Sequence, residues 1–295
     1  MSQREDQAAT LRAQTPIITL HDERSRMIAV TGGKGGVGKS TIAINLAVTY
    51  SRRRGRVLAL DGDAGMADLN ILLGVAPERS LLDVVRGVPA DEVLIEAHGI
   101  HLIPALNGSY ALANLDDVAR RRIFDGVAAL GQRFDTLVID TPAGLGQNAV
   151  AFAGVAADVI IVATPEPLSL ADAYACMKVL RTRAGLQRAF VIPNAVRTPQ
   201  EADEVVDRLR TLNDRFLGVE LEELPAVPFD PAVRAAASAG VPLVLHAPES
   251  PAARALAKIA RSLDALSSPP SAGVGGFIGK WMRALGGAPQ TGDAE

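Results

Sequence analysis

The order of apolar and polar positions divides the chain into three parts. Residues 1–25 are polar and charged, and residues 267–276 (SSPPSAGVGG) have the serine, proline and glycine content that is typical of a flexible linker. Between these two segments, short apolar runs alternate with longer stretches of helical spacing. The apolar runs that predict strands are residues 27–30, 57–60, 100–105, 136–140, 159–164 and 189–194, followed by 224–228 and 241–245.

These runs are apolar at every position rather than at alternate positions. That pattern is typical of strands that are buried on both faces of a parallel sheet. The stretches between them predict helices at residues 39–53, 115–131, 168–183, 200–215 and 250–266. The alternation predicts one α/β domain over residues 26–266, with a doubly wound, mostly parallel sheet and helices on both faces.

Composition narrows the class of protein. The 295 residues are 48% hydrophobic, which is enough for one large domain with a sizeable core. The net charge of −3 provides no overall positive field for nonspecific nucleic-acid binding. The single cysteine, Cys176, excludes a disulfide framework or a thiolate metal cluster within one chain. Since we find no signal peptide and no apolar run of membrane-spanning length, we expect a cytoplasmic protein.

The first strand leads directly into the sequence VTGGKGGVGKST, residues 30–41. Its spacing fits the P-loop pattern of strand, glycine-rich turn and helix, in which backbone N–H groups surround phosphate oxygens. The helix that follows adds the positive end of its dipole. In this pattern Lys39 reaches the β- and γ-phosphates and the Ser40 hydroxyl binds Mg²⁺. The predicted nucleotide-binding residues here are Gly33, Lys34, Gly35, Gly36, Val37, Gly38, Lys39, Ser40 and Thr41.

Lys34 follows the first glycine of the loop, where an ordinary P-loop needs no lysine. With this lysine, the loop resembles the deviant Walker A P-loop of the MinD/ParA family of ATPases. The resemblance extends over most of the chain and implies binding of ATP and Mg²⁺. It also implies an ATP-bound homodimer in which Lys34 crosses the interface to the partner's nucleotide and acts as a catalytic residue beside Lys39.

Three aspartates follow apolar strands, at the end where open α/β sheets bind ligands. The stretch VLALDGDAGMADLNILLGV (residues 57–75) resembles the first switch of the family, which implies that Asp63 orients the attacking water and that Asp61 supports the metal site. The stretch TLVIDTPAG (136–144) resembles the Walker B strand, with Asp140 holding Mg²⁺ through water. Asp68 and Asn70 stand where family members often have Asn and then Asp.

Adenine recognition is predicted at three residues. Asn194 ends a strand, and its amide can both donate to and accept from the edge of the base. The family usually has arginine after this asparagine, whereas this chain has Ala195, so base stacking must come from another residue. The stretch VPFDPAVR (227–234) resembles the adenine-flanking loop of the family, which implies roles for Pro228 and Asp230. A structural turn is the alternative for this loop.

The segment after the linker has the pattern of a membrane-surface helix. Bulky apolar residues occupy one side of a helical wheel, and Lys280 and Arg283 occupy the other. The alternative is a final helix packed on the protein's own core. The residues predicted to contact an anionic membrane surface are Phe277, Ile278, Trp281, Met282 and Leu285.

The polar N-terminal segment contains DQAATLR at residues 6–12. Within the MinD/ParA family, the chain is similar to the branch that regulates the number and placement of bacterial flagella, whose members carry Asp-Gln-Ala-x-x-Leu-Arg near the N-terminus. In that branch the motif activates a flagellar GTPase of the signal-recognition-particle type. The residues that this resemblance assigns to the partner GTPase are Asp6, Gln7, Leu11 and Arg12.

Together these features predict a slow, partner-regulated ATPase that dimerises with ATP and cycles between the cytoplasm and the inner membrane. The resemblance implies control of flagellar assembly, with flagellar switch proteins or a transcription factor as further candidate partners. The alternative is a chromosome- or plasmid-partition ATPase that binds nonspecific DNA, which would call for a basic dimer face; we therefore expect no direct DNA binding. An iron–sulfur carrier of the same fold would need paired cysteines.

Overall fold

The structure, a computed structural model, describes residues 26–63, 68–105, 115–130 and 133–266. The predicted activating motif (residues 6–12), the linker and the predicted membrane helix (277–285) lie outside the described residues. The division of the chain at residues 25 and 266 therefore stays a prediction. The described ranges contain the whole of the predicted α/β core except three short gaps.

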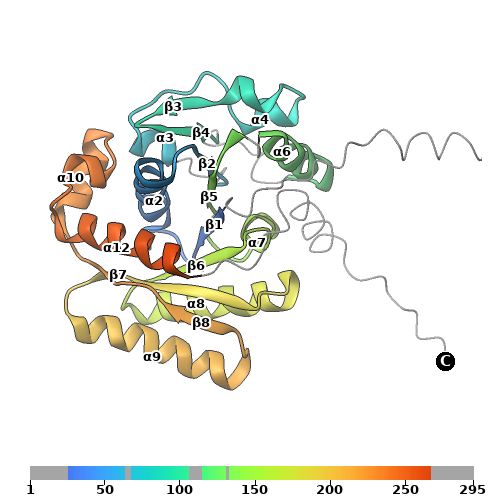
Figure 1. The fold of residues 1–295 in the computed structure, drawn as a ribbon. Coiled ribbons are helices and arrows are strands. Elements are labelled where there is room, and N and C mark those ends of the chain that lie inside the picture. The colour runs from blue at the N-terminus through green and yellow to red at the C-terminus, as the bar shows by residue number, and fades with distance from the viewer. Residues whose placement is uncertain (1–25, 64–67, 106–114, 131–132, 267–295) are drawn as a thin grey trace, which may run out of the picture.

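A mostly parallel sheet of nine strands forms the centre of this core (Figure 1). The strand order is β3-β4-β2-β5-β1-β6-β7-β8, and β9 pairs with the end of β7. Within the described residues, the one antiparallel pair is β3 with β4. The strands are β1 (Arg26–Thr31), β2 (Val57–Asp61), β3 (Ile95–Ala97), β4 (Ile100–Ile103), β5 (Thr136–Asp140), β6 (Asp158–Ala163), β7 (Arg188–Val196), β8 (Glu220–Glu223) and β9 (Val227–Pro228).

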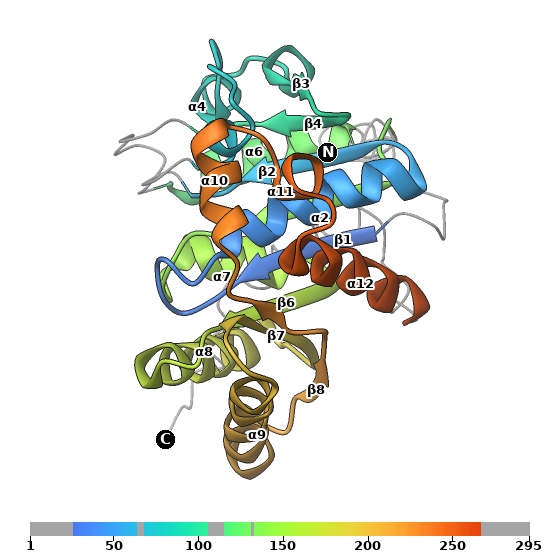
Figure 2. The same cartoon turned by 90° about the vertical axis from the view of Figure 1, so that its left-hand side faces the viewer.

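Helices cover both faces of the sheet, as the sequence predicted (Figures 1 and 2). One face carries α2 (Lys39–Arg54), α3 (Leu69–Leu72), α10 (Pro231–Ala239), α11 (Leu243–His246) and α12 (Pro251–Ala265). The other face carries α4 (Leu81–Val85), α6 (Asp117–Leu130), α7 (Gln147–Gly154), α8 (Pro167–Val179) and α9 (Pro199–Phe216). A 3₁₀ turn covers Ala90–Val93, and one π-helical turn, Leu180–Ala184, continues α8.

The continuous apolar runs are explained by this two-sided burial. In β1, Met27 and Ala29 pack into the core under α6 and α7, whereas Ile28 and Val30 pack into the core under α2 and α12. All four side chains are buried. The same alternation makes the inner positions of the other central strands hydrophobic, as is typical of parallel strands between two helical layers, and the charged residues Asp61, Asp140 and Asp158 stand at strand ends.

Two of the predicted strands are corrected by the structure. The run 241–245 forms the helix α11 instead, since Pro242 fits the residue before a helix and the N–H of Val244 donates to Asn45 Oδ1 at 2.9 Å. Of the run 224–228, only Val227 and Pro228 pair in the sheet, as β9. Short apolar runs beside prolines do not distinguish a strand from a buried helical turn.

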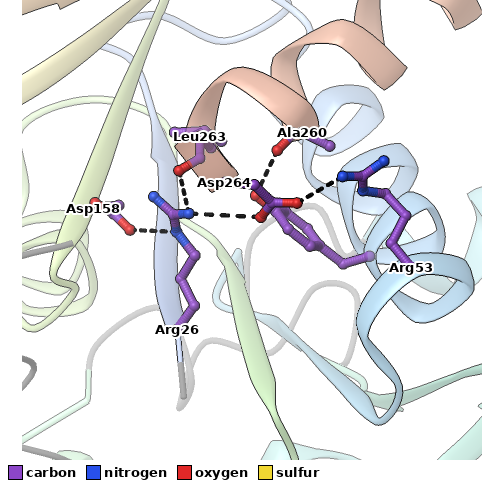
Figure 3. Close-up of polar contacts among 7 residues, drawn as sticks. Arg26, Arg53, Asp158, Ala260, Leu263 and Asp264 are labelled. Carbon is purple, nitrogen blue, oxygen red and sulfur yellow. Dashed lines mark hydrogen bonds and ion pairs between the residues drawn. The ribbon is translucent and has the colours of Figure 1, made fainter. Parts of the chain in front are cut away.

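A buried ion-pair network fastens the beginning of the sheet to the last turn of α12 (Figure 3). The Arg26 Nε donates to Asp158 Oδ2 at 2.7 Å, with 4% and 0% of the two side chains exposed. The Arg26 guanidinium also donates to the Leu263 carbonyl oxygen and lies 3.8 Å from Asp264. Asp264 in turn pairs with Arg53 of α2 at 2.9 Å. This network lies at the amino end of β1, so it positions the strand that leads into the glycine-rich loop.

Candidate nucleotide-binding site

The glycine-rich loop connects the carboxyl end of β1 to the first turn of α2. Gly38 precedes α2 with φ of 95°, a left-handed conformation that favours glycine. A Cβ on Gly38 would lie 2.3 Å from Asn194 Nδ2, and one on Gly33 would lie 2.0 Å from the Asp172 carbonyl oxygen of α8. Because neither position has room for a side chain, the two glycines let the loop from β1 to α2 pass closely between β7 and α8.

Lys39 is the first residue of α2, and its side chain is turned into the loop. The residue is only 6% exposed, and its Nζ donates to the Lys34 carbonyl oxygen at 3.5 Å. An ammonium group held inside a ring of backbone amides at a helix N-terminus is a binding site for phosphate. The predicted role of Lys39 fits this geometry.

Asp61 and Asp140 stand next to each other at the carboxyl ends of the paired strands β2 and β5. Both are buried, with 0% and 1% exposed. Burial, followed by the charge of Asp140, raises the pKa of Asp61 well above its ordinary value, although the N–H groups of Asp63 and Leu69 donate to it. Burial also raises the pKa of Asp140 to about 7, against the opposing influence of the Ser40 hydroxyl and then the Lys39 ammonium.

These residues fit a magnesium ion. Neither carboxylate oxygen of Asp140 has a hydrogen-bond partner of ordinary geometry among the described residues, and a buried carboxylate without donors needs a cation or water. Asp140 would hold the ion with Ser40, as predicted, while Asp61 stands beside them. The described residues contain no cluster of three His, Cys, Asp or Glu side chains for a metal, so phosphate oxygens and water would complete the shell.

The first switch brings two further carboxylates to this end of the sheet. Asp63 follows β2, and its N–H donates to Asp61 Oδ1 at 3.1 Å. Burial, followed by the charge of Asp63, raises the pKa of Asp68, whereas the charge of Lys39 lowers it. Asp68 precedes α3, and the N–H of the next residue, Leu69, donates to Asp61 Oδ2 at 3.3 Å, so Asp68 lies beside the site although the sequence gave it no role. Asn70 Oδ1 is buried and has no hydrogen-bond partner in the described part of the chain.

Asn194 lies near the carboxyl end of β7, and its side chain contacts the glycine-rich loop. Its Nδ2 donates to the Val37 carbonyl oxygen at 2.7 Å, so one amide proton positions the loop. Ala195 follows with a positive φ of 57°. The Arg197 guanidinium lies over the ring of Phe229, 4.7 Å from its centroid, and the ring is 53% exposed. This cation–π pair is exposed and follows Asn194 and Ala195 along the chain.

The loop predicted to flank adenine has a structural role, which is the alternative that the sequence left open. Asp230 precedes α10 and accepts from the N–H groups of Ala232 at 2.9 Å and Ala252 at 3.1 Å. Burial works to raise its pKa, but these bonds outweigh burial and lower it. Since each oxygen accepts a backbone N–H, the Asp230 carboxylate connects α10 to α12. In β9, Pro228 pairs with Val196 of β7, and Val227 pairs with Asn194.

Lys34 has a partner that the sequence gave no reason to expect. Its Nζ lies 2.9 Å from Glu166 Oε2, in an ion pair between the loop and the residue that precedes α8. The two side chains are 36% and 67% exposed. The side chain of the predicted interface lysine is therefore held on its own protomer.

The loop, the buried lysine and the carboxylates form one constellation at the carboxyl edge of the sheet. Of the predicted residues, the structure brings together Lys39, Ser40, Asp61, Asp63 and Asp140, with Asn194 at the base end. This arrangement can bind a nucleoside triphosphate with Mg²⁺ and hold a water beside its terminal phosphate. The class that the fold and site define is a P-loop nucleoside triphosphatase.

Comparison with family models matches residues 23–264 to the model described as ParA, the NUBPL iron-transfer P-loop NTPase. The chain therefore belongs to the ParA/MinD family of P-loop NTPases. It is an ATPase whose cofactors are ATP and Mg²⁺.

Three relatives illustrate the similarity. The chain is 35% identical over 271 residues to the antiactivator FleN of Pseudomonas aeruginosa, covering 91% of this chain and 96% of FleN. It is 32% identical over 206 residues to the flagellum site-determining protein YlxH of Helicobacter pylori, covering 69% of each. The septum site-determining protein MinD of Pyrococcus horikoshii OT3, solved with Mg-ADP, superposes with a TM-score of 0.68 at 28% identity, over 81% of this chain and 96% of that one.

Among the residues that the structure describes, no helix has the length and apolar character to cross a bilayer.

Proposed function

We propose that this ATPase is a dimerising switch that regulates the number and placement of bacterial flagella. The observation that carries the proposal is the similarity to FleN over nearly the full length of both chains. The buried Lys39 of the glycine-rich loop and the buried Asp140 carboxylate support it, because they fit a phosphate and a magnesium ion. ATP would join two protomers, and hydrolysis would separate them. The similarity to the antiactivator FleN and to the flagellum site-determining protein YlxH supports the flagellar role.

We assign each residue of the site a separate role in hydrolysis. The loop amides and Lys39 would bind the phosphates, and Ser40 and Asp140 would hold Mg²⁺, which would supply positive charge beside the phosphate oxygens. Asp63 accepts hydrogen bonds from the attacking water and so orients it. Asn194 faces the adenine edge, and the Arg197–Phe229 pair offers the base a stacking surface.

The role of Asp63 leads to a testable separation of binding from hydrolysis. We expect Asp63→Ala to bind ATP normally, to hydrolyse it at least about tenfold more slowly, and to accumulate as dimer, because water orientation is lost while the phosphate loop stays intact. Turnover and mass by light scattering with ATP are the measurements. The control is Asp203→Ala on α9, an exposed aspartate outside the site. A monomeric Asp63→Ala protein with full activity would contradict the assignment.

We also propose that the segment after residue 276 binds anionic membrane, and that ATP strengthens this binding by joining two segments in one dimer. Deleting residues 274–295 should abolish sedimentation with anionic liposomes and leave ATP binding intact. Trp281→Glu should weaken sedimentation, because it places a charge on the apolar side of the helix. Gln290→Glu makes the same change of charge and should have no effect. Full sedimentation of the truncated chain would exclude this role.

The N-terminal segment is proposed to activate a flagellar GTPase of the signal-recognition-particle type. A peptide of residues 1–25 should raise steady-state GTP hydrolysis by that partner without the ATPase domain. Gln7→Ala should lose stimulation more than binding, because a glutamine amide can position the attacking water. Leu11→Ala should lose binding, because an apolar anchor is removed. A bound wild-type peptide that gives no stimulation would end this assignment.

An iron–sulfur carrier is the alternative that the description of the family model raises. Such a carrier binds its cluster through thiolates. This sequence contains one cysteine, Cys176, which is 4% exposed and close to Thr31 in the core. Burial raises the pKa of the Cys176 thiol to about 11, which keeps it protonated near neutral pH. One buried thiol does not supply the paired thiolates that a cluster needs, so this chain does not fit the iron–sulfur carrier.

A further inference from the structure

The contact between the glycine-rich loop and α8 bears on how the dimer forms. Lys34 lies in the loop and Glu166 lies 132 residues later, at the residue before α8. The Lys34 ammonium and the Glu166 carboxylate are 2.9 Å apart, which is the distance of a direct, charge-assisted hydrogen bond. The contact therefore connects two segments that only the fold brings together.

The Glu166 carboxylate has no competing role in its own helix. Glu166 occupies the position before α8, yet its side chain makes no capping hydrogen bond; Ser169 Oγ instead accepts from the N–H of Thr164. The carboxylate extends to Lys34 instead. The backbone on either side is fixed, because Gly33 packs against the Asp172 carbonyl oxygen and Pro167 begins the helix. The carboxylate is thus held at the place where the Lys34 side chain passes.

We propose that Glu166 is a positioning residue that retains Lys34 on its own protomer and thereby opposes ATP-driven dimerisation. The inference rests on the proposed function, in which Lys34 reaches the nucleotide of the partner subunit. To reach a phosphate across the interface, the Lys34 ammonium would have to leave the position from which it donates to Glu166 Oε2. Each protomer must therefore break its Lys34–Glu166 pair when the dimer closes, and a bound triphosphate offers the greater negative charge.

The size of the effect follows from the exposure of the pair. Exposed ion pairs contribute little, and two of them are broken in each dimer, so removing Glu166 should tighten the dimer by roughly 2- to 30-fold. Because the pair is exposed, its influence should also decrease as salt increases. Glu166 would then determine the protein concentration at which ATP-bound protomers dimerise, without contacting the nucleotide.

The test measures the dissociation constant of the dimer by light scattering over a dilution series. The full chain is used with Mg²⁺ and a non-hydrolysable ATP analogue. Glu166→Gln keeps the shape of the side chain and removes its charge, and it should tighten the dimer at low salt but not at high salt. Glu166→Asp keeps the charge and should restore an affinity close to that of the wild type. The matched control is Glu204→Gln, which removes an exposed glutamate paired with Arg208 on α9 and should leave the constant unchanged.

Lys34→Ala separates the inference from the function on which it rests. If Lys34→Ala dimerises as the wild type does, both the crossing role of Lys34 and the inference are wrong. If Lys34→Ala remains monomeric and Glu166→Gln leaves the dimer unchanged or weakens it, the inference alone is overturned. An equal tightening by Glu204→Gln would also overturn it, because the effect would then follow net charge rather than the Lys34–Glu166 pair.

Discussion

Lys39→Ala is expected to lose about 2–5 kcal/mol of ATP-binding free energy, as when one member of a buried charge pair is removed. Lys39 is almost fully buried, and its ammonium is directed into the loop that would hold the phosphates. Without it, the phosphate charge would meet the buried carboxylates Asp61 and Asp140 with less compensation. ATP binding by calorimetry is the direct measurement.

The control for this substitution is Lys258→Ala, which removes an exposed lysine from α12 and should leave ATP binding unchanged. Circular dichroism establishes that both variants are folded. A folded Lys39→Ala protein that binds ATP within twofold of the wild type would contradict the assignment of the phosphate site.

Asp158→Ala is expected to lower the free energy of unfolding by about 3–5 kcal/mol. The substitution would leave the Arg26 guanidinium buried without its closest carboxylate, at the amino end of the strand that leads into the phosphate loop (Figure 3). Urea unfolding monitored by circular dichroism gives the change. If the loss of the ion pair also displaces β1 and the glycine-rich loop, ATP should raise the free energy of unfolding of the variant by less than it raises that of the wild type.

Two control variants distinguish the cost of an unpaired buried charge from the loss of the ion pair itself. The double variant Arg26→Met with Asp158→Leu should recover most of the stability, because two apolar side chains can replace a buried pair at little cost. Asp125→Ala breaks the exposed pair with Arg121 and should cost less than about 1 kcal/mol. A loss of stability by Asp158→Ala no greater than that of Asp125→Ala would contradict this interpretation of the network.

The regular parts of the fold were predictable because their signals are local. The inner positions of each central strand are apolar, and the spacing of glycines before Lys39 is specific to one kind of turn. The same reasoning failed at residues 241–245, where β-branched and apolar residues favour a strand, but Pro242 and the Asn45 side chain stabilise a helical turn. Local preference there gives way to a contact with a helix almost two hundred residues earlier.

The candidate site shows the same division. Ser40, Asp61 and Asp140 were predictable because strand ends and the loop motif determine their places. Contacts between residues far apart in the sequence were not predictable, because no pattern of spacing along the chain indicates them. The Lys34–Glu166 pair spans 132 residues, and the Arg197–Phe229 stack depends on how β9 pairs with β7. Asp230 was assigned from resemblance, and only the structure reveals its two bonds to backbone N–H groups.

The proposed function requires that ATP convert this chain from monomer to dimer. The most direct test is the mass of the wild-type full chain by light scattering, first with Mg²⁺ and a non-hydrolysable ATP analogue, and then with Mg-ADP. We expect twice the monomer mass of 30.8 kDa with the analogue and the monomer mass with ADP. The same mass with both nucleotides, at concentrations where both are bound, would contradict it.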